Sequence, residues 1–71
     1  MAKSKLHQAI ADMHGVDWSE TDGSDVRRIL RRHGLVKGSV TRDELGSVPG
    51  LNLFMRNTIG EFLGMGKRAF G

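Results

Sequence analysis

The fold of this chain is decided by residues 24–45, which read SDVRRILRRHGLVKGSVTRDEL. The first half of this stretch has apolar residues at the spacing of one helix face: Val26, Ile29 and Leu30. The pattern predicts a helix that starts near Ser24, covers residues 25–33 and ends before Gly34. Leu35 is then in position to fold back onto this helix in a Schellman cap.

The second half of the stretch contains the clearest helix start in the chain. Thr41 and Glu44 have the spacing of a capping box, and Val40 and Leu45 have that of the hydrophobic staple around it. Two glycines and a proline follow within GSVPG, and the residue before a proline disfavours helix. A short helix is therefore expected over residues 42–46.

Amphipathic patterns flank this stretch on both sides. The segment KLHQAIADMH predicts a helix over residues 5–14, capped by Ser4 and ended by a left-handed Gly15. The segment LNLFMRNTIGEFLGMGKRAF has apolar residues at helical spacing almost throughout. It predicts the main core-facing helix over residues 51–65.

Together these segments predict an all-α fold. One small domain should span residues 1–71 as a bundle of three to four helices with a long C-terminal core helix. Residues 1–3 and 67–71 are expected to fray. The predicted core draws on apolar side chains from every helix: Leu6, Ile10, Met13, Val26, Ile29, Leu30, Leu45, Leu51, Phe54, Met55, Ile59, Phe62 and Leu63.

The composition excludes several classes of protein. The chain has 71 residues and no cysteine, so neither disulfides nor thiolate metal sites can stabilise it. A core of this size is marginal, which argues against a deep enzyme cleft and leaves a homo-oligomer open. No apolar run approaches the ~20 residues that cross a bilayer, so we expect no membrane partner and a cytoplasmic protein.

No catalytic, metal or cofactor site is expected from the residue patterns. The serines lie in predicted caps and loops, and no nucleophile, base and orienting group can be assembled, so the protein is expected not to be an enzyme. His7 and His14 lie two turns apart without a third ligand for zinc. The glycines of GEFLGMG match neither a phosphate loop nor a dinucleotide fingerprint.

Positive charge is concentrated in one block of the chain. The formal net charge is +3, but residues 1–26 carry −3, residues 27–42 carry +6 without any acid, and residues 43–71 are neutral. Such asymmetry is typical of proteins with a polyanionic or acidic partner. The cations of this block are the predicted phosphate contacts: Arg27, Arg28, Arg31, Arg32, Lys37 and Arg42.

Two functions remain open at this point. The first is a small nucleic-acid-binding or nucleoprotein-associated domain, with DNA as the expected ligand and little base reading. The alternative is a protein-binding accessory or inhibitory module that docks on an acidic partner surface, of the kind that suits a small viral or mobile-element product. In a third interpretation, the arginines only form a solvated face and pair with the acidic residues 12–25.

Two resemblances to known families point in the same two directions. The stretch DVRRILRRHGLVKGSVTRDEL is similar to helix–extended-loop–helix modules of the SAP and LEM type, through the residues Ile29, Leu30, Gly34, Leu35 and Leu45. That resemblance implies binding to DNA or to chromatin-associated proteins. The stretch IADMHGVDWSETDGSDVRRI resembles the short helix and loop of peripheral subunit-binding domains, which implies docking on a partner protein. The two resemblances are incompatible, so neither assigns the chain to a family.

Overall fold

The computed structural model describes residues 4–71, and these contain helices and no strand. The elements are α1 (Lys5–Ala11), the 3-10 helix η1 (Asp12–Gly15), α2 (Ser24–Arg32), α3 (Arg42–Gly46) and α4 (Leu53–Phe62). The predicted all-α fold is confirmed. The Cα radius of gyration is 11.0 Å, so the helices pack on one another and not in an extended row.

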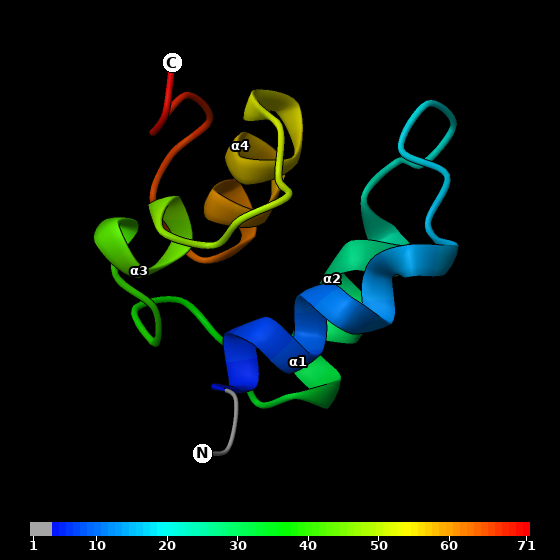
Figure 1. Ribbon diagram of the computed structural model, residues 1–71, viewed down its shortest axis with the longest axis horizontal. Helices are drawn as coiled ribbons and strands as arrows, with labels where there is room; N and C mark the ends of the chain where they lie inside the picture. The colour runs from blue at the N-terminus through cyan, green and yellow to red at the C-terminus, as the bar shows by residue number, and fades with distance from the viewer. Residues whose placement is uncertain (1–3) are drawn as a thin grey trace.

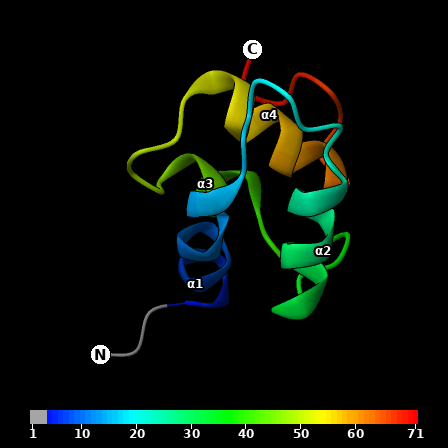
Figure 2. The ribbon, with the colours of Figure 1, turned by 90° about the vertical axis from the view of Figure 1, so that its right-hand side faces the viewer.

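The helices are arranged as a pair with a third helix across one end. α1 and α2 lie against each other, and α1 passes in front of α2 in Figure 1. In Figure 2 the two helices stand side by side, and α4 lies across their upper ends. α3 packs against α4. This arrangement leaves one side of α2 free of helix neighbours.

Twelve buried apolar residues form a single core. They are Leu6, Ala9, Met13, Val26, Leu30, Leu35, Val40, Leu45, Val48, Leu51, Ile59 and Leu63. Ala9, Leu35, Val40 and Val48 were not in the predicted core. Four residues that were in it are only half-buried and pack against the cluster: Ile10, Ile29, Met55 and Phe62. Each of the four α-helices contributes at least one buried side chain, so the small core ties all of them together.

The prediction that Phe54 belongs to the core is wrong. Its side chain is 57% exposed, in the first turn of α4. The ring meets Trp18 edge-on, with the centroids 6.3 Å apart and the planes at 86°. Helical spacing places Phe54 beside the apolar face of α4, but at this end of the helix only the loop that carries Trp18 covers it.

The C-terminal end of α2 has the predicted Schellman geometry. Gly34 is left-handed, with a φ of 75°. Its N–H donates to the carbonyl of Arg31 at 3.0 Å, and the N–H of Leu35 donates to the carbonyl of Leu30 at 2.9 Å. These two bonds satisfy carbonyls that a helix end otherwise leaves open and turn Leu35 into the core.

The N-terminal end of α2 differs slightly from the prediction. Ser24 is already helical, and the N-cap position belongs to Gly23, which has a φ of 93°. Glycine adopts this conformation without the penalty that a Cβ atom brings. Asp22 takes the capping role, because its Oδ1 atom accepts the N–H of Ser24 at 2.9 Å.

The first helix is shorter than predicted. The α-helical geometry ends at Ala11, and the chain tightens into η1, where the N–H of Val16 donates to the carbonyl of Met13 at 3.0 Å. Gly15 does not have a positive φ, so the predicted left-handed cap is wrong at this position. The 3-10 turn satisfies the helix end without a Schellman motif.

The last two helices have well-defined ends. The predicted capping box of α3 is present: Thr41 Oγ1 accepts the N–H of Glu44 at 3.1 Å, and Glu44 Oε1 accepts the N–H of Thr41 at 3.4 Å. α4 begins two residues later than predicted, because the side chain of Asn52 accepts the N–H of Met55 and caps the helix. It ends at Phe62, three residues earlier than predicted, before the left-handed Gly64 with its φ of 85°.

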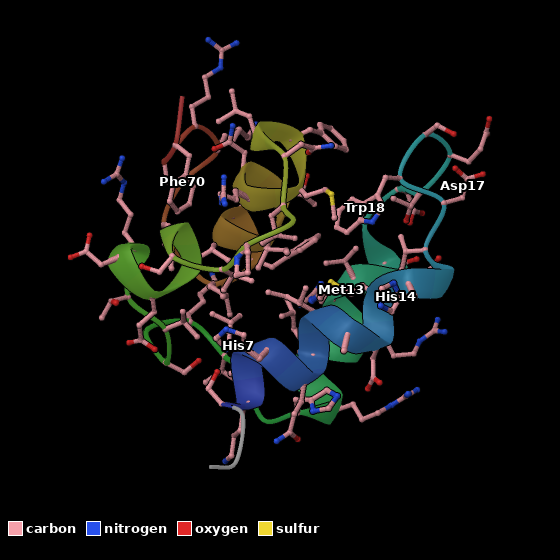
Figure 3. All side chains as sticks on the ribbon, viewed as in Figure 1. His7, Met13, His14, Asp17, Trp18 and Phe70 are labelled. Atoms are coloured by element: carbon pink, nitrogen blue, oxygen red, sulfur yellow. The ribbon has the colours of Figure 1, made fainter. Side chains whose placement is uncertain are left out.

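The C-terminal segment packs back onto the helices. Fraying was predicted for residues 67–71, but the N–H of Phe70 donates to Asn57 Oδ1 at 3.0 Å. The guanidinium of Arg42 lies over the Phe70 ring, 5.1 Å from its centroid. Its Nε–H donates to the carbonyl of Ala69 at 2.7 Å. Figure 3 shows the Phe70 ring between α3 and the chain end. The predicted fraying of residues 1–3 lies outside the described residues.

Candidate nucleic-acid interface

Four arginines project from the free side of α2. They form two pairs of one-turn spacing: Arg27 with Arg31, and Arg28 with Arg32. Successive residues of a helix are about 100° apart, so the two pairs point in different directions. All four side chains are exposed, whereas Val26 and Leu30 on the opposite face are buried.

The first pair borders a groove between α2 and the end of α4. Two adjoining surface cavities of about 460 and 320 Å³ share Arg27, Arg31 and Phe62 in their walls. The other residues that line them are Asp22, Gly23, Ser24, Arg28, Leu30, Leu35, Val36 and Lys37. We call this combined surface the basic groove.

Phe62 lines the basic groove because the end of α4 comes close to the first turn of α2 (Figure 2). The approach depends on Gly23, since a Cβ atom there would lie 2.7 Å from Cζ of the Phe62 ring. The ring is half-buried: it packs against the core and also lines both cavities. A change in how Phe62 packs against the core would therefore also change the shape of the groove.

Alanine at Gly23 is expected to destabilise the protein more than alanine at Gly38. Both glycines have a positive φ, of 93° and 83°, so each substitution should cost about 1 kcal/mol in backbone strain. Only the new methyl group at Gly23 meets a neighbour, the Phe62 ring, which should raise the loss to about 2 kcal/mol. Urea unfolding of both variants measures the difference. Equal losses would mean that Phe62 does not rest on Gly23.

Lys37 lies at the other end of the basic groove, in the turn that follows α2. The N–H of Gly38 donates to the carbonyl of Leu63 at 3.3 Å, which ties this turn to the end of α4. A Cβ atom on Gly64 would lie 3.4 Å from Cβ and Cγ of Lys37, so the two residues are in close contact. The lysine stem is therefore held in place while its ammonium group remains exposed.

Among residues 4–71, the cations of the basic groove have no acidic partner. Within residues 4–71, no carboxylate lies within 4.0 Å of the charged groups of Arg27, Arg28, Arg31 or Lys37. The residue of α2 and its C-cap that contacts a carboxylate is His33. Its Nε2 atom lies 2.5 Å from Asp12 Oδ2, and this contact links the end of α2 to η1. Direct pairing with the acidic residues 12–25 therefore does not account for these arginines.

Asp22 is the acidic residue among those that line the basic groove. Hydrogen bonds from the backbone N–H and then the hydroxyl of Ser24 hold the pKa of the Asp22 carboxyl below its ordinary value. The carboxylate is therefore ionised at neutral pH. It lowers the positive charge of the cavity at the start of α2, which Arg27, Arg28 and Arg31 also line, whereas no acidic residue lines the cavity with Lys37.

Replacing Asp22 with asparagine is expected to strengthen binding of an anionic ligand. The amide oxygen can still accept the N–H of Ser24, but the charge at the groove end is gone. We expect affinity for an oligonucleotide to rise about two- to fivefold at low salt. Asp17→Asn is the matched control, because Asp17 makes the same kind of turn with Ser19 outside the groove. An equal rise in both variants would point to net charge alone.

The structure brings together part of the predicted contact set. Arg27, Arg28, Arg31 and Lys37 line the basic groove. Arg32 lines a different cavity of about 230 Å³ together with Asp12 and Asp25, and Arg28 lines this cavity as well. Arg42 lies on α3, where it covers the C-terminal aromatic ring, and it lines neither cavity of the groove.

The sequence analysis placed neither Phe62 nor Asp22 at the binding surface. Phe62 was assigned to the core, because helical spacing does not reveal which part of an apolar face a neighbour covers. Asp22 could have been found, since an aspartate two residues before a helical serine is a typical turn and capping arrangement. Its position at the groove, however, depends on the crossing of α4.

A second concave surface lies on the side of α1. Its cavity, of about 440 Å³, is lined by residues of α1, η1 and the loop before α4, and includes His7, Trp18 and Met55. In Figure 3, Met13, His14 and Trp18 lie on this side of the molecule, while Asp17 lies on the loop that follows η1. No lysine or arginine lines this cavity. Within residues 4–71, no three His, Asp or Glu side chains lie close enough together to hold a metal ion.

The comparisons with known proteins do not indicate a function for this chain. No family model matches the chain, and the searches of curated proteins and of solved structures found no match. Among the helices of residues 4–71, none is long and apolar enough to span a membrane. The basic groove is the surface where a cluster of cations coincides with a concave shape.

Proposed function

We propose that this protein binds nucleic acid, without catalysing a reaction, through the basic groove. Arg27, Arg31 and Lys37 hold phosphates, and Arg28 contacts the backbone at the rim. The observation that carries the proposal is that these exposed cations line two adjoining cavities and have no acidic partner within residues 4–71. Cations without a partner can neutralise phosphates and release the counterions condensed on them.

The side-chain chemistry suits phosphate contacts. The guanidinium group of arginine presents a planar fork of N–H donors that matches two phosphate oxygens, and lysine adds a point charge. Base reading by the start of α2 is not part of the proposal, because Asp22 and Asp25 lie there and repel the backbone of a duplex. Binding should therefore depend on backbone charge and only weakly on sequence.

A protein partner with an acidic surface is the second candidate for the same residues. Val36 is 58% exposed and lines the basic groove next to Lys37. An exposed apolar side chain beside a cation is typical of a protein contact, in which carboxylates would replace phosphates. The class of ligand that binds distinguishes the two candidates.

Fluorescence anisotropy with labelled single-stranded and duplex DNA tests the proposed function. We expect micromolar or tighter binding at about 50 mM salt, and a slope of log K against log salt of about −3 to −4, because four cations meet phosphates. Polyglutamate serves as the acidic polypeptide in competition. Absence of DNA binding at low salt would overturn the proposal, and displacement by polyglutamate at equal charge would favour the protein partner.

A further inference from the structure

We infer that the basic groove prefers single-stranded nucleic acid to duplex, with one unpaired base stacked on Phe62. This inference rests on the proposed function and names the form of nucleic acid that the same site takes. It follows from three features of the groove: its concave shape, the aromatic ring in its wall, and the presence of a carboxylate in only one of its two cavities.

The shape of the groove suits a single nucleotide. Its two cavities of about 460 and 320 Å³ lie in the size range of small-ligand pockets. In a duplex the bases are stacked and paired inside the helix, so none can enter such a pocket without being flipped out. A single strand can turn one base inward and keep its phosphates at the rim.

The position of Phe62 suits base stacking. Its half-buried ring lines both cavities, as Arg27 and Arg31 do, and it is the aromatic residue of the groove. Arginines that follow the backbone, together with an aromatic ring that stacks on bases, are the usual means of binding single strands without sequence preference. Contact with Gly23 fixes the ring, so little side-chain freedom is lost when a base binds.

The difference in charge between the two cavities determines where the phosphate and the base of a nucleotide lie. The cavity that Lys37 lines has no acidic residue in its wall, whereas the cavity that Arg28 lines also contains the Asp22 carboxylate, which repels phosphate. A phosphate chain that follows the whole groove, as on the surface of a duplex, would meet this carboxylate. A strand that turns its base toward Phe62 avoids it.

The other three aromatic residues do not offer the same combination. The Arg42 guanidinium already covers the Phe70 ring. Trp18 and Phe54 meet edge-on near the cavity beside α1, but no lysine or arginine lines that cavity. A base could stack there only without a phosphate contact from the same cavity. The basic groove is therefore the surface that joins both contacts.

Phe62→Leu tests the inference. Leucine keeps an apolar side chain against the core but removes the stacking surface. We expect the wild-type protein to bind a single strand at least about tenfold more tightly than a duplex of the same sequence. In the variant the single-strand affinity should fall about 5- to 100-fold, with duplex affinity nearly unchanged. Phe54→Leu is the matched control: the same change on the same helix outside the groove, expected to leave both affinities unchanged.

A measurement on the unaltered protein covers the case in which Phe62→Leu does not fold. Ring protons of Phe62 should shift upfield in the NMR spectrum when single-stranded DNA is added, as stacking on a base requires, and those of Phe54 should not. If the arginines are needed for binding but Phe62→Leu leaves the preference intact, or no ring shift is seen, the inference is wrong while the proposed function stands. If neither form of DNA binds, the proposed function itself is wrong.

Discussion

Replacing Leu30 with alanine is expected to leave a large fraction of the protein unfolded at 25 °C. The Leu30 side chain is 2% exposed and lies at the centre of the core face of α2. Removing a buried leucine side chain down to Cβ costs about 2–5 kcal/mol, because apolar contacts are lost and a cavity is left. A domain of this size has a net stability of only about 3–5 kcal/mol, so the loss is comparable to the whole.

Circular dichroism during thermal unfolding measures this effect. Leu53→Ala is the matched control, since Leu53 is 49% exposed at the start of α4 and should lose less than about 1 kcal/mol. A Leu30→Ala variant that melts at the wild-type temperature would contradict the described packing of α2. It would also contradict the described position of the basic groove, because burial of the Val26 and Leu30 face of α2 is what turns Arg27 and Arg31 outward.

The second large effect concerns binding. Replacing both Arg27 and Arg31 with alanine is expected to weaken binding to single-stranded DNA by about 10- to 100-fold at low salt, because two charged phosphate contacts are lost. The slope of log K against log salt should become less steep by about 1.5 to 2. Both side chains are exposed, so the fold should persist.

Arg32→Ala with Arg68→Ala is the control for net charge. The variant loses the same two charges, from the other arginine pair of α2 and from the exposed C-terminal segment. Long-range attraction alone should lower its affinity by no more than about threefold. Equal losses in the two double variants would mean that total charge, and not the basic groove, determines binding.

The fold links these two predictions through α2. Val26 and Leu30 turn one face of the helix into the core, and this fixes the direction in which Arg27 and Arg31 point. The Schellman turn at Gly34 then carries the chain to Lys37 on the same side. The stability of the core and the geometry of the basic groove therefore depend on the same nine-residue helix.

Sequence alone predicted the features that local chemistry determines. The capping box of Thr41 and Glu44, and the Schellman end of α2 at Gly34, each depend on residues within six positions, and both are present. The charge of the α2 surface also followed from helical spacing. These features can be predicted without knowing which helices pack against each other.

Features that depend on distant contacts were not predictable in this way. Phe54 and Phe62 have similar apolar neighbours in sequence, yet one is 57% exposed and the other lines the groove, because α4 meets α2 only near its end. Val48, which precedes a proline in a loop, is buried at 3% exposure because the loop folds under the helices. Tertiary packing decided each of these positions.

An NMR titration of ¹⁵N-labelled protein with single-stranded DNA tests the central claim most directly. If the basic groove is the binding surface, amide shifts should concentrate in residues 22–38 and 60–64, with smaller changes in α3. Shifts that concentrate around Trp18 and Met55, on the cavity beside α1, would contradict the account, as would a spectrum that DNA leaves unchanged at low salt.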